Sequence, residues 1–290
     1  MPDSDLKKIL KRAQKNHYAI GQFNFSTFEQ LEAIVKATNK FKSPIILGTS
    51  EGESEFLGLK QAVALLRVYR DKTGVPFFLN LDHGKSFDYI KKAIDSGYDA
   101  VHFDGSNLPL KENIEISKRV VKYAKKFNVL VEGEVGRIGT ESSKIYKQIF
   151  EINEEDLTKP EEAEEFVRKT GVDSLAVGIG TFHGIESFGK NPKIRISRLK
   201  EIKSQTKDCF LVLHGGSGTL KSDIKKAIKF GIVKININTE LRVAYTKGLR
   251  EVLKQNPEEI TPYKYFPKVI KSVQKIVEEK LKLFGTNNKT

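Results

Sequence analysis

The stretch "PFFLNLDHG" (residues 76–84) alternates apolar and polar side chains along a run of strand length. Because side chains two apart share a face of a strand, Leu79 and Leu81 face one way while Asn80 and Asp82 face the other. Asp82 and His83 close the run, where a turn carboxylate and a surface histidine would be the ordinary interpretation. The stretch predicts a strand packed on one face, with polar side chains on the other.

Seven other apolar runs of strand length accompany this one, and amphipathic segments such as residues 110–127 separate them. Eight strand–helix units in 290 residues predict an α/β fold, a (β/α)₈ TIM barrel in one domain (1–290), with extra C-terminal helices over residues 263–285. The alternative is a doubly wound open sheet, which usually has fewer strands and a glycine-rich turn after the first. The eight runs are residues 19–25, 44–50, 76–84, 100–106, 129–136, 174–184, 209–218 and 233–240.

Composition excludes several classes of protein. The formal net charge is +13, but the lysines are spread over the predicted helices and mixed with Glu, so solvated helix faces explain most of it and we expect no nucleic-acid partner. The remaining positive charge would favour the binding of an anionic substrate. No apolar run reaches membrane-spanning length and the N-terminus lacks a signal-peptide core, which predicts a cytoplasmic protein with no membrane association. Cys209, the single cysteine, lies in an apolar run and predicts a buried thiol.

Polar side chains share one face of several predicted strands, close to the carboxyl end of each. One apolar and one polar face per strand predict a polar pocket at the mouth of the barrel. A long interruption after the fifth strand (residues 137–159) predicts a lid or site loop, with disorder or a small hairpin as alternatives. The polar sets are Gln22/Asn24, Gly48/Ser50, Asn80/Asp82, His102/Asp104/Ser106, Glu132/Glu134 and Lys234/Asn236/Asn238.

Three of the five histidines lie at the predicted carboxyl ends of the third, sixth and seventh strands. These residues, His83, His183 and His214, are each followed by glycine. Three neutral imidazoles with an open position are typical of catalytic zinc, so we predict a metal site here. His17 is expected at the surface, and His102 is expected to be a hydrogen-bonded interior residue.

The motifs "HGGSG" (214–218) and "NINTE" (236–240) end the last two predicted strands, where barrel enzymes often bind phosphate. Gly215, Gly216 and Gly218 would allow backbone N–H groups to face an anion, and Ser217 and Thr239 offer hydroxyls. The helices that follow would present their positive N-terminal ends. This corner is therefore a predicted phosphate site.

With these motifs in hand, the chain resembles the class II, metal-dependent ketose-bisphosphate aldolases, which include fructose-1,6-bisphosphate and tagatose-1,6-bisphosphate aldolases. The resemblance implies a zinc-dependent carbon–carbon lyase. Such an enzyme reversibly cleaves a ketose 1,6-bisphosphate, most often fructose 1,6-bisphosphate, to dihydroxyacetone phosphate and glyceraldehyde 3-phosphate, and zinc stabilises the enediolate. The resemblance covers about residues 5–285 and rests on "GQFNF", "PIILGTS", "LDHG", "FDGS", "VEGEVG", "GTFHG", "HGGSG", "NINTEL" and "KLKLFGT".

Roles follow from this resemblance, position by position. It implies that His83, His183 and His214 hold zinc and that Asp82 moves the proton of the C4 hydroxyl. Asp104 and Glu134 match carboxylates beside the metal that can hold a second divalent or a monovalent cation. The remaining matches would bind the phosphorylated sugar: Asn24 and Ser50 its aldehyde half, and Gly184, Gly215, Ser217, Asn236, Asn238 and Thr239 its dihydroxyacetone-phosphate half.

Three positions depart from the family pattern. The loop Glu that exchanges the C3 proton is replaced by Ser142, with Glu141 beside it as the candidate substitute. Ser187 occupies the position of a phosphate-binding Lys, with Lys190 three residues on. Tyr263 occupies that of an Arg near the final helices, with Lys264 beside it. These changes concern sugar-phosphate specificity rather than the metal.

Three other functions remain open beside a fructose-bisphosphate aldolase. One is an aldolase for tagatose 1,6-bisphosphate or another phosphorylated ketose. Another is a catalytically impaired sugar-phosphate-binding protein, against which Asp82 and the three histidines argue. A metal-dependent hydrolase is the third, which the phosphate corner disfavours. The resemblance also implies a homodimer or homotetramer.

Overall fold

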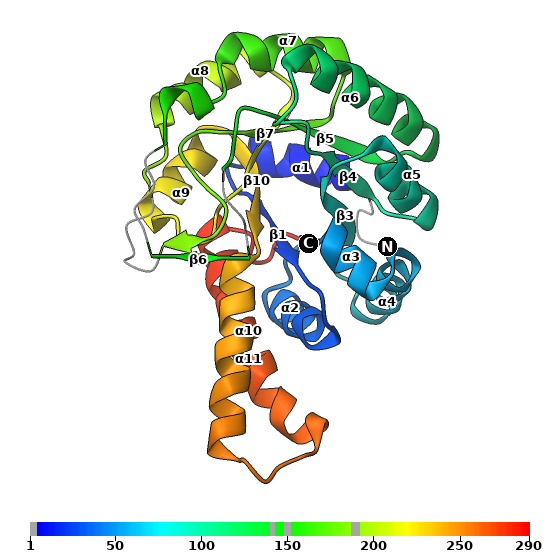
Figure 1. Ribbon diagram of the computed structural model, residues 1–290, viewed down its shortest axis with the longest axis vertical. Coiled ribbons are helices and arrows are strands. Elements are labelled where there is room, and N and C mark those ends of the chain that lie inside the picture. Colours follow the sequence, from blue (N-terminus) through cyan, green and yellow to red (C-terminus); the bar gives the residue numbers. More distant parts are fainter. Residues whose placement is uncertain (1–4, 140–142, 148–151, 187–191) are drawn as a thin grey trace.

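The computed structural model describes residues 5–139, 143–147, 152–186 and 192–290. They form a closed barrel of eight parallel strands, which confirms the predicted (β/α)₈ fold (Figure 1). Each predicted run overlaps one barrel strand, and the strands follow one another around the barrel in chain order until β10 pairs with β1. They are β1 (Ile20–Asn24), β2 (Ile45–Ser50), β3 (Phe77–Gly84), β4 (Ala100–Phe103), β5 (Leu130–Val135), β7 (Ser174–Val177), β9 (Phe210–Leu213) and β10 (Ile232–Ile237).

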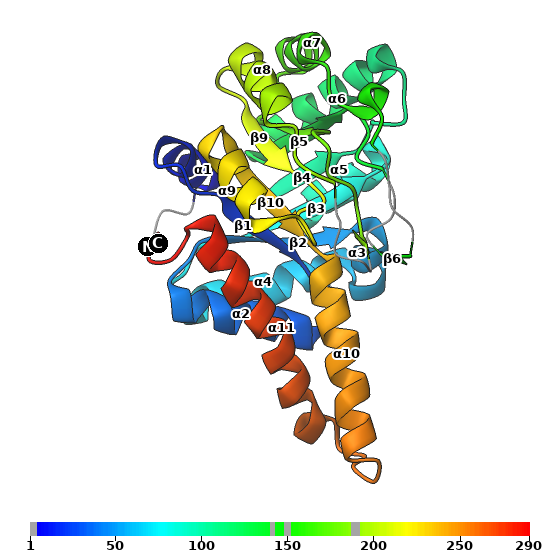
Figure 2. The same ribbon diagram turned by 90° about the vertical axis from the view of Figure 1, so that its left-hand side faces the viewer.

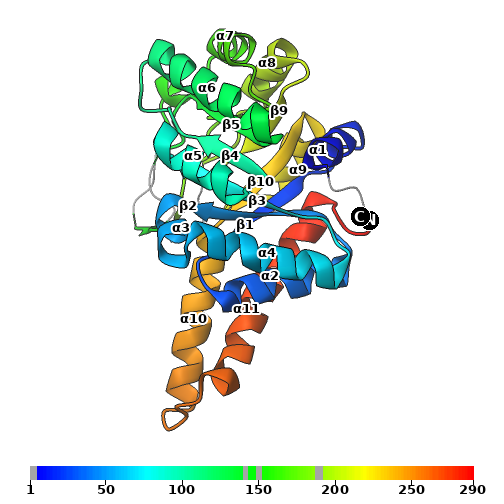
Figure 3. The same cartoon turned by 90° about the vertical axis from the view of Figure 1, so that its right-hand side faces the viewer.

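Helices cover the outside of the barrel (Figures 1 and 3). Their ends follow sequence signals: the Ser86 side chain accepts from Tyr89 N–H to begin α5, and Gly97 ends α5 in the left-handed conformation. The helices are α1 (Leu6–Lys15), α2 (Phe28–Phe41), α3 (Glu51–Leu57), α4 (Leu59–Thr73), α5 (Phe87–Ser96), α6 (Leu110–Ala124), α7 (Pro160–Thr170), α8 (Ile196–Thr206), α9 (Lys221–Lys229), α10 (Thr239–Gln255) and α11 (Pro262–Phe284).

The outward faces of the strands form the main hydrophobic core with these helices. Phe23, Leu79, Leu81, Phe103 and Ile235 are all almost completely buried there. Burial of one such side chain stabilises the fold by roughly 1.5–3 kcal/mol. The apolar face predicted from the alternating pattern is therefore the helix-facing side of the barrel.

The inward faces change from apolar to polar along the barrel axis. At the amino-terminal end, Ile20, Phe78 and Phe210 pack against Ile9 and Leu10 of α1, which covers that end. Further along each strand come buried polar side chains, and these lead to the carboxyl ends where the site lies. The polar interior residues are Gln22, Asn24, Asn80, Asp82, His102, Glu132, Glu134, Lys234 and Asn236.

Two short strands lie outside the barrel, at its carboxyl-terminal side. β6 (Ile145–Tyr146) pairs in parallel with β8 (Ile185–Glu186), so the long interruption predicted after the fifth strand does not form a hairpin within its described part. A 3₁₀ turn, η2 (Glu154–Asp156), follows in the same interruption. A second 3₁₀ turn, η1 (Lys125–Phe127), ends α6.

The last two helices form an arm that extends from the barrel. α10 leads away from the barrel to the distal end of the arm, where α11 begins and runs back beside it (Figures 1 and 2). The returning half of α11 packs against α2 and, through Phe284, joins the main core. α11 confirms the C-terminal helix predicted over residues 263–285, and α10 is the helix that follows the last barrel strand.

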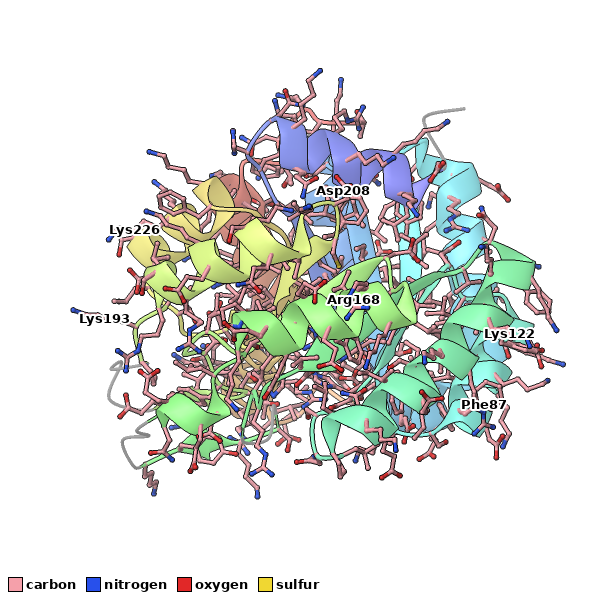
Figure 4. The ribbon with its side chains drawn as sticks, turned by 90° about the horizontal axis from the view of Figure 1, so that it is seen from above. Phe87, Lys122, Arg168, Lys193, Asp208 and Lys226 are labelled. Atoms are coloured by element: carbon pink, nitrogen blue, oxygen red, sulfur yellow. The ribbon has the colours of Figure 1, made fainter. Side chains whose placement is uncertain are left out.

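Charged side chains cover the outer faces of the helices. Seen from above, Lys122, Arg168 and Lys226 extend from α6, α7 and α9, and Lys193 and Asp208 from adjoining loops (Figure 4). Both signs are interspersed, as in the pairs Lys169–Glu165 and Arg168–Glu164. No helix among the described residues is both long and apolar enough to cross a bilayer.

Candidate active site

Three imidazoles converge at the carboxyl end of the barrel. The ring centroid of His83 lies 4.7 Å from that of His183 and 4.7 Å from that of His214, and His183 and His214 are 5.8 Å apart. His83 lies at the end of β3 and His214 directly follows β9. His183 was expected at the end of the sixth strand, but β7 ends at Val177 and the loop after it carries His183 back to the site.

One nitrogen of each ring contacts an oxygen outside the cluster. His83 Nδ1 lies 2.8 Å from Asp104 Oδ2, and His214 Nε2 lies 2.7 Å from Glu132 Oε1. His183 Nδ1 lies 2.8 Å from the Ile138 carbonyl oxygen. Carboxylate and carbonyl oxygens only accept, so each of these nitrogens donates. The lone pair of each neutral ring is therefore on its other nitrogen.

The inward nitrogens fit a metal ion. His83 Nε2 and His214 Nδ1 lie 3.0 Å apart, and two lone pairs at that distance repel unless a cation lies between them. Nitrogens bound to one tetrahedral zinc lie about 3.3 Å from one another. Outer hydrogen bonds of this kind are also what fixes the orientation of metal-bound histidines. The residues present thus match zinc in donor type, and the spacing of His83 Nε2 and His214 Nδ1 is close to that of two ligands of one ion.

Buried carboxylates favour positive charge on His83, whereas burial lowers the pKa of His183 and of His214. Burial opposes charging of His83, yet Asp82, Asp104 and Glu134 raise its pKa to about 10. Burial and the neighbouring imidazoles lower the pKa of His183 to about 3. Burial favours the neutral form of Asp82, but the surrounding imidazoles and Lys234 outweigh it and hold the pKa of its carboxyl well below the usual range.

Asp82 is held rigidly at the floor of the site. It is 5% exposed, and its two oxygens accept hydrogen bonds from Asn24 Nδ2 (2.9 Å) and Asn236 Nδ2 (3.0 Å). Asn24, which was expected to contact substrate, is completely buried and lines neither cavity of the site, and its amide also donates to Glu53 and accepts from Gln22. Asn24 therefore positions Asp82 from behind.

Glu53 is a site residue that the sequence analysis missed. Its carboxylate accepts from Asn24, Asn238 and Arg242, the last at 2.6 Å. It also forms a capping box with Ser50 at the start of α3. The spacing of Ser50 and Glu53 in "SEGE" carried that signal.

An inner recess connects these groups. Its volume is ≈ 20 Å³, enough for one or two water-sized groups. Every residue that lines it belongs to the predicted site: Asp82, His83, His183, Gly184, His214, Gly215, Ser217, Asn236, Asn238 and Thr239.

A wider cavity of ≈ 440 Å³ lies against the inner recess, and both are lined by His83 and His183. Ser50 and Asp104 line it, together with the cationic side chains of Lys85, Arg137 and Arg242. Arg242 pairs with Glu53, but Lys85 and Arg137 form no ion pair within the described residues.

At the glycine corner, the predicted phosphate site formed by residues 214–218 and 236–240, two loops come into close contact. Gly215 has φ +65°, and a Cβ there would overlap the Phe182 carbonyl, so only glycine fits. Thr239 begins α10, whose positive N-terminal end faces this corner. Gly218, by contrast, donates its N–H to the Glu240 carboxylate (Oε1, 2.7 Å), so this N–H already has a partner within the protein.

The remaining predicted residues divide into three groups. Glu134 is buried with Oε2 3.9 Å from His83 Nδ1, and Asp104 is half-buried on the same ring. Glu141, Ser142, Ser187 and Lys190 lie outside the described residues. Tyr263 is 76% exposed near the start of α11, and Lys264 beside it pairs with Glu259, so neither lies at this site of its own chain.

Known proteins are similar to this chain over nearly its whole length. A family model described as fructose-bisphosphate aldolase class-II matches residues 4–289. A fructose-bisphosphate aldolase of Staphylococcus epidermidis is 36% identical over 294 residues, covering 100% of this chain and 99% of that protein. A probable fructose-bisphosphate aldolase of Bacillus subtilis is 36% identical over 293 residues, 99% of each chain. The crystal structure of the YdjI aldolase from Escherichia coli K12 has a TM-score of 0.83 at 31% identity, covering 99% of this chain and 98% of that one.

Proposed function

This chain belongs to the class II fructose-bisphosphate aldolase family and is a carbon–carbon lyase, and on that premise we propose that it reversibly cleaves fructose 1,6-bisphosphate. The products would be dihydroxyacetone phosphate and glyceraldehyde 3-phosphate. The observation that carries this proposal is the inward convergence of three imidazole lone pairs beside an ionised, buried Asp82.

His83, His183 and His214 would hold a zinc ion through Nε2, Nε2 and Nδ1. When bound, zinc supplies a Lewis acid for the ketone oxygen and for the negative charge that cleavage leaves on the dihydroxyacetone-phosphate half. Asp104, Glu132 and the Ile138 carbonyl keep the three rings oriented. Asp104 and Glu134, beside His83, are the proposed ligands of a second cation.

Asp82 would take the proton of the C4 hydroxyl on one of its carboxylate oxygens as the C3–C4 bond breaks. Its lowered pKa keeps it ionised and so able to accept. The hydrogen bonds from Asn24 and Asn236 fix where that oxygen lies. Glu141 is the proposed carboxylate for the second proton, at C3.

The phosphate next to the ketone would bind at the glycine corner. Gly184 and Gly215 have positive φ and line the inner recess with Ser217 and Thr239. The amide oxygens of Asn236 and Asn238 are buried without hydrogen-bond partners among the described residues, so they can accept from substrate hydroxyls.

The aldehyde half would occupy the wider cavity, beside Ser50. Lys85 and Arg137 lack a carboxylate partner there, which supports an anionic group at the far end of the substrate. That feature favours a bisphosphate over a ketose 1-phosphate. It does not distinguish fructose from tagatose, so a tagatose 1,6-bisphosphate aldolase is the second candidate.

A substrate comparison tests the proposal. Zinc-loaded protein would be given fructose 1,6-bisphosphate, tagatose 1,6-bisphosphate and fructose 1-phosphate, and release of dihydroxyacetone phosphate would be followed. We expect the highest kcat/KM for fructose 1,6-bisphosphate. A higher kcat/KM for tagatose 1,6-bisphosphate would identify that sugar as the substrate instead. No release of dihydroxyacetone phosphate from any of the three would overturn the aldolase proposal.

A further inference from the structure

His102 is a fourth imidazole beside the three proposed metal ligands, and the proposed function leaves it without a role. It lies on β4, is completely buried, and its ring centroid is 4.8 Å from that of His83 and 4.9 Å from that of His214. Ligand atoms of Asp82, His83, His102 and His214 all lie within 4.8 Å of one another. By proximity alone, His102 could be a ligand.

The hydrogen bonds of His102 argue against ligation. Its Nδ1 accepts from the backbone N–H of His83 at 3.1 Å. That lone pair is therefore in use, and the proton of the neutral ring is on Nε2. Neither nitrogen is left with a free lone pair for a cation.

The same hydrogen bond holds the main chain of His83 in an uncommon conformation. His83 has φ +52°, in the left-handed region that residues other than glycine seldom adopt. The pairing of β3 with β4 shifts register between Leu81 and Gly84, so the His83 N–H turns to a side chain. That conformation directs the His83 ring inward.

Nε2 of His102 faces a second member of the site. It lies 3.3 Å from Glu134 Oε2, and both atoms are buried without a hydrogen-bond partner among the described residues. A carboxylate in such surroundings needs a nearby donor, since an unpaired buried polar group costs about 1–3 kcal/mol.

We propose that His102 is a positioning residue of the metal centre and not a ligand: its Nδ1 holds the backbone of His83 and its Nε2–H faces the Glu134 carboxylate. This inference rests on the proposed zinc site. Nδ1 is the atom that matters most, because it sets the direction of a metal-binding ring.

A pair of polar variants separates the two ring nitrogens. His102→Asn keeps an acceptor oxygen near the position of Nδ1, whereas His102→Gln keeps a polar group only near Nε2. Zinc dissociation constants would be measured by chelator competition, with circular dichroism of the zinc-free chains as the check on folding. His17→Asn, at an exposed histidine, is the control.

We expect His102→Gln to bind one zinc per chain about 10–100-fold more weakly than wild type, and His102→Asn to lie closer to wild type. The Co²⁺ absorption bands of both variants should keep the wild-type coordination number. Equal zinc affinities of the two variants, or a changed coordination number in both, would overturn the inference about His102 but not the proposed function. A wild-type chain that binds no zinc would overturn the proposed function as well.

Discussion

Lys234→Met should destabilise the protein strongly, because it removes one half of a buried ion pair. Lys234 Nζ lies 2.6 Å from Glu132 Oε2, and their side chains are 5% and 4% exposed. With an effective dielectric constant of about 20, attraction at that distance is roughly 6 kcal/mol, part of which offsets the cost of removing both charges from water. Loss of one partner from such a pair typically costs 3–5 kcal/mol, and we expect about 4 kcal/mol here.

The assay is urea unfolding of zinc-free protein, so that weakened metal binding does not contribute. The double variant Lys234→Met with Glu132→Gln should recover most of the lost stability, because it leaves no uncompensated charge. Lys91→Met, which breaks the exposed pair with Asp95, is the control and should leave the midpoint unchanged. A loss below about 1 kcal/mol in the single variant, or a double variant no more stable than the single, would refute the reasoning.

Three further predictions concern individual site residues, two through the reaction and one through stability. Asp82→Asn should keep zinc affinity but lower kcat by about 10²–10⁴-fold in a dihydroxyacetone-phosphate release assay, and a kcat within threefold of wild type would exclude Asp82 as the proton carrier. Gly215→Ala should cost roughly 1–3 kcal/mol in urea unfolding because of its positive φ and the Phe182 carbonyl; an unchanged midpoint would contradict that contact. Arg137→Met should raise KM for fructose 1,6-bisphosphate but not for fructose 1-phosphate, and an equal rise for both would place the distal anion elsewhere.

The fold and most of the site could be predicted because strand alternation is a local property. Asn80 and Asp82 point inward and Leu79 and Leu81 outward simply because their spacing is two. The run at 174–184 was predicted too long as a strand: Gly178 and Gly180 follow Val177, and the chain leaves the barrel there. The prediction that His183 joins the other two histidines was correct, although this residue lies in the loop after the strand and not at the end of the strand.

Roles that depend on hydrogen bonds between distant residues could not be predicted. The acceptor role of His102 requires the register shift at β3, which no sequence pattern indicates. Gly218 donates to Glu240, 22 residues away, so its turn chemistry gave no sign of where its N–H points. Asn24 lay on the correct face, but its depth in the barrel depends on how Glu53 and Asp82 pack around it.

Zinc titration of metal-free protein tests the central claim most directly. Dihydroxyacetone phosphate release from fructose 1,6-bisphosphate should be absent after EDTA treatment, rise linearly with added zinc and level off at one zinc per chain. His183→Ala should show no such break at matched zinc concentrations. Full activity in the metal-free protein, or a wild-type titration identical to that of His183→Ala, would contradict the three-histidine zinc site.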